Sequence, residues 1–470
     1  MTELADVLNG PSGPHVVAFV DFDGTLIHGY SGVDFYRDRM RRRQVGPGEF
    51  LRNAAASLDY RVRTADITGL FTQTVRSWRG LAEQDLLDLG DRLFGSTIAG
   101  RVYPEAREIV AAHRSMGHTV VLATSATRYQ VQPLATDLGV DTVLCTAVEI
   151  ADGVVTGRID GPILWGIGKA EAVIAYAAAH DIDLAECYGY GNGDEDIPFL
   201  EAVGHPRPLN PRKRLAAVAA ERGWPIRHLR GRGRPGALDI ARTGAALGAV
   251  VTALGVSTGI GLLNGDRRLA ANLVGSLAPD AALALAGIRV EVSGEEHLWS
   301  RRPAVFLFNH QSALDVLIVG KLVRRDVTAL AKKEAAKDPL FAPIGKLIDV
   351  AYVDRGNREQ TTAAIAPVLD RLAAGISVAI APEGTRSATP RLGPFKKGAF
   401  HIALQARVPL VPIVIRNAGD LLWKGSYIAR PGTLHVVVLP PVSTEDWTLV
   451  DLPTRIADVR QQFLDVLGHE

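Results

Sequence analysis

Short apolar runs alternate with helix-like segments through the C-terminal part of the chain, and this alternation limits the folds open to it. The runs lie at residues 288–292, 304–308, 327–330, 350–353, 378–381, 410–415 and 434–439. Continuous apolar runs are typical of strands buried on both faces, as in a mostly parallel sheet covered by helices. We therefore predict an α/β domain over residues 288–470.

A histidine and an aspartate follow the second of these runs. The string Asn-His-Gln-Ser-Ala-Leu-Asp occupies residues 309–315. Open α/β sheets bind ligands beyond the carboxyl ends of their strands, so His310 should face a ligand. Asp315 is placed to hold the ring nitrogen that faces away from that ligand, and the pair can then act as a general base on a substrate hydroxyl. The alternative is a capped helix start that contains the two residues by chance.

Chain length, net charge and cysteine content limit the domain count, the partners and the cell compartment of the protein. A chain of 470 residues should hold two or three domains, since a domain usually has roughly 100–200 residues. The formal net charge of +1 gives no overall positive field, so nucleic acid is not an expected partner. Cys145 and Cys187 lie in apolar or strand-like surroundings, which favours a reducing compartment over a disulfide framework. Residues 1–14 lack the basic and apolar regions of a signal peptide.

A second string with paired carboxylates follows an apolar run near the N-terminus. The run covers residues 15–20, and Asp-Phe-Asp-Gly-Thr-Leu occupies residues 21–26. Asp21 and Asp23, closed by a glycine turn, make a compact site for Mg²⁺. One aspartate can attack a phosphoryl group while the other handles the proton of the leaving group. The alternative is a plain turn after a strand.

This string resembles the first motif of the haloacid dehalogenase superfamily, and three later motifs follow in order. They are an apolar run at 120–125, a predicted helix start at 168–171 and the string Tyr-Gly-Tyr-Gly-Asn-Gly-Asp-Glu-Asp at 188–196, which should follow a strand. The resemblance is to the phosphoserine-phosphatase-like branch (subfamily IB). It implies a Rossmann-like phosphatase domain over residues 15–228, with a helical cap at about 30–97 that closes over the substrate.

The resemblance also implies the roles of individual residues. Ser125 would donate to the phosphoryl oxygens, and Lys169 would neutralise the phosphate charge. The Mg²⁺ ligands would be Asp21, Asp23, Asn192 and Asp196. Asn192 stands where the family has an acidic residue, and an amide oxygen binds Mg²⁺ with less charge.

The residues between the two domains differ from both domains in composition. Residues 229–241 are basic and glycine-rich and are predicted to form a linker, and 242–287 a membrane-associating helical hairpin. Residues 243–265 carry no charge, are long enough for the ~20-residue span of a bilayer, and have glycines spaced for close helix packing, at 244, 248, 255 and 259. Three interpretations stay open: a hairpin that dips into one leaflet, a buried core helix and a spanning helix.

The second half of this hairpin is predicted to be amphipathic. Its apolar face would hold Leu269, Leu273 and Leu277, against a polar face with Asn272, Ser276 and Asp280.

Further polar residues follow the strands predicted around His310. They are Lys332, Arg355, Glu383, Gly384, Arg386 and Lys396. Cations that converge beside a histidine base indicate a substrate with both a hydroxyl and a phosphate or carboxylate. A glycine at a strand exit lets the backbone approach the ligand closely.

This set resembles the lysophospholipid (glycerolipid) acyltransferase family, and in particular the bacterial 1-acylglycerol-3-phosphate acyltransferases. The resemblance implies that His310, oriented by Asp315, deprotonates the free hydroxyl of lysophosphatidate, which attacks the thioester of acyl-CoA or acyl carrier protein. Lys332, Arg355 and Arg386, with Lys396, would hold the phosphate, and Glu383 and Gly384 would shape the site.

The two resemblances together imply a bifunctional enzyme of phospholipid biosynthesis. It would lie on the cytoplasmic face of the cell membrane as a peripheral or monotopic protein. The alternative is an acyltransferase alone, with the N-terminal domain as a catalytically weak scaffold.

Overall fold

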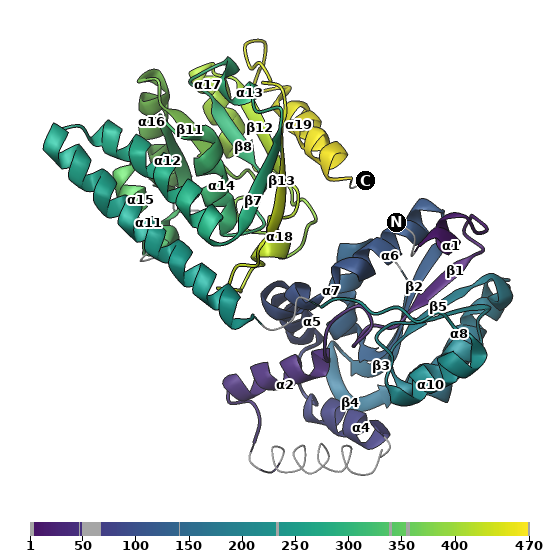
Figure 1. Ribbon diagram of the computed structural model, residues 1–470. Helices are drawn as coiled ribbons and strands as arrows, with labels where there is room; N and C mark the ends of the chain where they lie inside the picture. The colour runs from purple at the N-terminus through teal and green to yellow at the C-terminus, as the bar shows by residue number, and fades with distance from the viewer. Residues whose placement is uncertain are drawn as a thin grey trace. The chain divides into compact units, whose positions relative to one another are not determined.

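The computed structural model describes residues 4–46, 48, 67–140, 142–231, 235–337, 341–353 and 358–468. The chain divides into two compact units, Met1–Gly233 and Arg234–Glu470, and each has its own apolar core (Figure 1). Arg355, which the sequence assigned to phosphate binding, lies outside the described residues.

The N-terminal unit is built on a six-stranded sheet with the order β4-β3-β2-β1-β5-β6. Its strands are β1 (Val17–Val20), β2 (Thr119–Thr127), β3 (Thr142–Ala151), β4 (Val154–Asp160), β5 (Tyr188–Gly191) and β6 (His205–Pro208). All neighbours are parallel except β3 and β4. The string at 188–196 was expected to follow a strand. Its first four residues, Tyr188–Gly191, instead form strand β5.

Helices cover both faces of this sheet, because side chains alternate across each strand. Ala18 and Val20 of β1 pack with α6 (Pro104–Ser115) and α7 (Arg128–Leu138). Val17 and Phe19 pack on the other side, with α8 (Ile167–Ala179), α9 (Ile197–Glu201) and α10 (Lys213–Arg222).

The segment predicted to form a helical cap is mostly helical where it is described. It holds α2 (Ser31–Arg41), α4 (Ile67–Ser77), α5 (Glu83–Leu93) and a π-helix (Phe94–Ile98). Short elements complete the unit: α1 (Ala5–Leu8) and 3₁₀ turns at Ala99–Arg101, Leu184–Glu186 and Asp194–Asp196.

The C-terminal unit holds a seven-stranded sheet with the order β10-β9-β11-β8-β12-β13-β7. All seven predicted strands are present: β7 (Ile288–Ser293), β8 (Val305–Phe308), β9 (Val327–Lys332), β10 (Ala351–Val353), β11 (Ser377–Ile380), β12 (Leu410–Ile415) and β13 (Gly432–Val438). The strands from β10 to β12 in this order are mutually parallel, so their carboxyl ends meet at one edge.

Two helical layers cover this second sheet (Figure 1). One face packs against α12 (Arg267–Leu285) and α14 (Leu314–Val323), and the other against α16 (Arg358–Ala373), α17 (Gly398–Ala406) and α19 (Leu452–Leu467). The remaining elements are α13 (His297–Ser300), a 3₁₀ turn at Lys333–Lys337, α15 (Phe341–Leu347) and α18 (Ala418–Leu421). The α/β class expected from the alternating runs is confirmed.

The predicted hairpin is formed by α11 (Ala237–Asn264) and α12, which pack along each other (Figure 1). Helix α11 begins at Ala237, so its first turn lies within the predicted linker 229–241. Among the described residues, α11 is the one helix whose length and composition would allow it to cross a membrane. Most of its residues are exposed, which argues against the interpretation as a buried core helix.

Two details of the hairpin differ from expectation. A methyl group built on any of the four spaced glycines of α11 would meet no atom within 4 Å, so they do not mediate close packing. Gly261 does so instead, against Ala270. The predicted polar face of α12 also points inward: Asn272 and Ser276 bond to the 324–326 turn, whereas Leu277 is 45% exposed.

Candidate functional sites

The first site lies where β1 and β5 end side by side. Asp21 follows β1 and Asn192 follows β5, and the hydroxyl of Thr25 bonds to a side-chain oxygen of each, at 2.9 and 3.1 Å. Any side chain at Gly24 would collide with Asn192, so the glycine of this turn is required by space as well as by its left-handed backbone. The first and fourth motifs are therefore adjacent, as the parallel pairing of β1 with β5 requires.

A buried lysine connects this site to Asp196. The amine of Lys169, in the first turn of α8, donates to Asp21 at 2.8 Å and to Asp196 at 2.7 Å. The other oxygen of Asp196 accepts the backbone N–H groups of Asn192 and Gly193, both at 2.9 Å. Burial raises the pKa of Asp21 to about 6, against the opposing charge of Lys169. A lysine held between two buried carboxylates stays charged.

Asp23 follows β1, and Ser125 lies on β2, the strand that pairs with β1. Both carboxylate oxygens of Asp23 accept hydrogen bonds from Ser31, at the start of α2, with distances of 2.7 and 3.0 Å. Burial raises the pKa of Asp23 to about 7. Ser125 is half-buried on β2, next to β1. Asp23 thus meets the first helix of the cap segment.

The four predicted metal ligands are not arranged so that all four side chains could coordinate one ion. Asp21 and Asn192 converge on Thr25, and the carboxylate of Asp23 is hydrogen-bonded to Ser31. Lys169 donates to both Asp21 and Asp196. Among the described residues, no group of three or more histidine, cysteine, aspartate or glutamate side chains is arranged to hold a metal ion. The oxygen donors of Asp21 and Asn192 nevertheless suit Mg²⁺, which usually takes only one or two carboxylates from a protein.

The second site lies beyond the carboxyl end of β8. His310 Nδ1 lies 2.8 Å from Asp315 Oδ2, and the Gln311 and Ser312 backbone N–H groups donate to the same oxygen at 2.7 and 2.8 Å. The Asp315 side chain is fully buried, and that of His310 is 20% exposed. This ring is therefore held by a buried carboxylate while one edge stays accessible.

Neighbouring strands fix the backbone that carries this histidine. The side chain of Asn309 bonds to both backbone groups of Ile415, at the end of β12. Glu383, beyond β11, accepts the N–H groups of His310 and Gly393 at 2.8 and 2.9 Å, and burial raises its pKa. Glu383 thus contacts the histidine loop directly, and Gly384 beside it adopts a left-handed conformation.

The described cations lie at the same sheet edge. Lys332 ends β9 and is half-buried, whereas Arg386 and Lys396 are exposed in the segment after β11. Sequence patterns missed Lys424, which lies in the loop after α18 and donates a 3.1 Å hydrogen bond to the carbonyl of Arg386. No motif surrounds Lys424, so only the folded chain reveals this neighbour.

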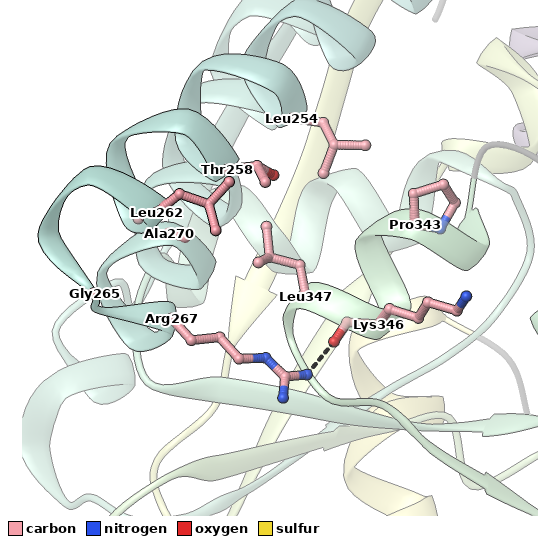
Figure 2. Close-up of a pocket in the computed structure, with 10 residues that line it drawn as sticks. Leu254, Thr258, Leu262, Gly265, Arg267, Ala270, Pro343, Lys346 and Leu347 are labelled. Atoms are coloured by element: carbon pink, nitrogen blue, oxygen red, sulfur yellow. Dashed lines mark hydrogen bonds between the residues drawn. The ribbon is translucent and has the colours of Figure 1, made fainter.

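An open groove of about 610 Å³ lies elsewhere in the C-terminal unit, between the tip of the hairpin and α15 (Figure 2). Leu254, Leu262 and Leu347 give it an apolar lining. The Arg267 guanidinium donates to the carbonyl of Lys346 at its rim. None of the predicted site residues lines this groove.

Comparison with known proteins agrees with this division. Residues 18–201 match the family model of haloacid dehalogenase-like hydrolases, and residues 289–416 match that of acyltransferases. Phosphoserine phosphatase SerB1 of Mycobacterium tuberculosis is 31% identical over 245 residues, which cover 50% of this chain and 80% of the relative.

The C-terminal unit has relatives of its own. The 1-acyl-sn-glycerol-3-phosphate acyltransferase of Limnanthes alba is 36% identical over 183 residues, covering 38% of this chain and 63% of the plant protein. The crystal structure of the 1-acyl-sn-glycerophosphate acyltransferase PlsC from Thermotoga maritima aligns with 49% of this chain and 97% of that chain, at 22% identity and a TM-score of 0.43. By its match to the first of these families and to the mycobacterial relative, the chain belongs to the haloacid dehalogenase-like hydrolases through its N-terminal unit, and residues 289–416 of its C-terminal unit match the acyltransferase family model.

Proposed function

We propose that the C-terminal unit transfers an acyl chain to the free hydroxyl of 1-acylglycerol-3-phosphate and so forms phosphatidate. The observation that carries this proposal is the accessible His310 ring held at 2.8 Å by the buried Asp315. In the reaction, His310 Nε2 takes the hydroxyl proton, and the oxygen attacks the thioester carbonyl of acyl-CoA or acyl carrier protein. The C–S bond then breaks, and the departing thiolate takes the proton from the His310 imidazolium.

The charged neighbours support a phosphorylated acceptor. Lys332 and Arg386 lie at the edge of the sheet where His310 emerges, and cations are the natural partners of a phosphomonoester. The name of the Limnanthes alba relative points to the same acceptor. Glu383 shapes the site by holding the His310 backbone.

We further propose that the N-terminal unit hydrolyses a phosphomonoester. Asp21 is the nucleophile, Lys169 offsets the charge of the phosphoryl group, and Ser125 donates to its oxygens. Asp23 is suited to give a proton to the leaving group, because burial raises its pKa to about 7. Asp21 and Asn192 would hold Mg²⁺, whose charge would favour the attack of one anion on another.

The alternative is that only the acyltransferase is active. Asn192 favours this alternative, because an amide contributes no charge to a Mg²⁺ site, and Lys169 already offsets part of the negative charge of Asp21 and Asp196. The N-terminal unit would then be a folded scaffold.

We propose that the hairpin places the enzyme on the cytoplasmic face of the membrane, as a peripheral or monotopic protein. Leu262 and Leu263, at the tip of α11, are 78% and 88% exposed. Exposed apolar side chains beside an apolar groove favour contact with lipid.

Product analysis tests both activities. The full-length protein is incubated with lysophosphatidate, acyl-CoA and Mg²⁺, beside His310→Ala and Asp21→Asn. We expect phosphatidate from the wild type and from Asp21→Asn but not from His310→Ala. Phosphatidate that forms equally well with His310→Ala would overturn the acyl-transfer proposal. The wild type and His310→Ala should release phosphate from phosphomonoesters, whereas Asp21→Asn should not. If the wild type releases no phosphate, the acyltransferase-only alternative is favoured.

A further inference from the structure

Lys424 is held beside the histidine site by two contacts between loops. The hydroxyl of Ser312 donates a 2.6 Å hydrogen bond to the carbonyl of Leu422, which fastens the segment before Lys424 to the loop of His310. The Lys424 amine in turn donates to the carbonyl of Arg386. Because its backbone and its amine are both anchored, this lysine occupies a defined place instead of moving freely in solvent.

The loop of Arg386 is fastened to the same histidine. The backbone N–H of Ser387 donates a 2.7 Å hydrogen bond to the carbonyl of His310. The segments that carry Arg386 and Lys424 are far apart in sequence, and both are therefore bonded to the loop of the general base. Sequence patterns identified the first of these segments and gave no sign of the second.

Two cations among the described residues act on Lys424. Burial, together with the charges of Arg386 and Lys332, lowers the pKa of the Lys424 amine, and no carboxylate is among its causes. Within the described residues, neither Lys424 nor Arg386 forms an ion pair. The like charges of Lys424 and Arg386 repel each other, and a bound anion offsets this repulsion.

The Lys424 amine has donors to spare for such an anion. An ammonium group carries three N–H donors, and the carbonyl of Arg386 takes one of them. We propose that Lys424 binds a phosphate group of a substrate, together with Arg386 and Lys332, a role that rests on the acyl-transfer function proposed above. The phosphate belongs either to the phosphomonoester of the acceptor lipid or to the CoA of the donor.

Steady-state kinetics on the full-length protein tests this role, with lysophosphatidate and acyl-CoA varied in turn. Lys424→Met removes the charge and keeps the length of the side chain, and Lys424→Arg restores the charge. Arg289→Met is the matched control, because Arg289 is an exposed cation on β7, at the far edge of the sheet from β10. Thermal unfolding of each variant shows that the fold is kept.

We expect the KM for one of the two substrates to rise about tenfold in Lys424→Met, the loss typical of one charge-assisted hydrogen bond, while kcat changes much less. A rise for lysophosphatidate assigns the phosphate to the acceptor, and a rise for acyl-CoA assigns it to the donor. Lys424→Arg should recover most of the loss, and Arg289→Met should behave as the wild type.

Two other outcomes have different meanings. If the wild type transfers acyl groups and the folded Lys424→Met variant keeps both KM values, the role of Lys424 is overturned while the proposed function stands. If the wild type transfers no acyl group to lysophosphatidate, the proposed function itself fails.

Discussion

A single carboxylate oxygen, Oδ2 of Asp315, accepts three hydrogen bonds at the histidine site. Two come from backbone N–H groups and one from His310 Nδ1, so Nε2 is left as the basic nitrogen. The negative charge matters as much as the geometry, because it stabilises the imidazolium that forms when His310 takes a proton.

Asp315→Asn should therefore lower kcat for acyl transfer by about 10²-fold or more and leave KM nearly unchanged. The amide keeps an acceptor in the same place but loses the charge. Glu291→Gln, on the exposed part of β7, is the control and should retain full activity. A folded Asp315→Asn enzyme with wild-type kcat would exclude Asp315 from catalysis.

Asn192 gives a second prediction at the scale of one residue. Asn192→Asp adds a carboxylate beside Asp21, so we expect Mg²⁺ to bind more tightly, with the affinity measured by isothermal titration calorimetry. Without Mg²⁺, the added charge should lower the melting temperature of the N-terminal unit. Asn210→Asp, in the same unit outside this cluster, controls for the added charge itself. Unchanged Mg²⁺ affinity would show that Asn192 is not a ligand.

At the scale of elements, the sequence predicted the seven strands of the second sheet because each is a continuous apolar run between polar segments. The resemblance to the haloacid dehalogenase motifs implied one site for Asp21, Lys169 and Asn192, which the structure brings together through hydrogen bonds to Thr25, Asp21 and Asp196. The orientation of α12 could not be predicted, because its polar face bonds to the turn before β9, a contact between distant segments. Lys424 was missed for the same reason.

The outward apolar face of the hairpin leads to the third prediction. Leu262→Glu combined with Leu263→Glu places two charges at the exposed tip of α11, so the protein should bind anionic phospholipid vesicles much more weakly in a sedimentation assay. Activity on a short-chain, water-soluble acceptor should persist. Leu449→Glu is the control, since Leu449 is 68% exposed in the segment before α19. Equal binding by all variants would place the lipid contact elsewhere.

At the scale of the whole molecule, the two units have separate cores and should respond separately to acid. His113 is buried in the N-terminal unit, where its ring bonds to His118 and Tyr190, both at 2.8 Å. Burial lowers the pKa of His113 from 6.5 to about 3. The unfolded chain therefore binds a proton below pH 6.5 that the folded unit does not.

The contribution of His113 to the free energy of unfolding of the N-terminal unit is fully present above pH 6.5 and is lost as the pH falls toward 3. The loss is about 1.4 kcal/mol per pH unit in this window. Asp21 and Asp23 act in the opposite direction in the same unit, because their raised pKa values let the folded unit bind protons that the unfolded chain releases. The contribution of His113 is therefore the difference between the wild type and His113→Gln in scanning calorimetry at pH 7.5 and pH 5.5. His113→Gln keeps a polar side chain that does not titrate, so between pH 7.5 and pH 5.5 its N-terminal unit should gain about 1.4 kcal/mol of stability relative to the wild type, even if it melts lower throughout. An equal acid shift in His113→Gln and the wild type would rule out His113 as the source. The transition whose temperature changes in His113→Gln at pH 7.5 identifies the N-terminal unit.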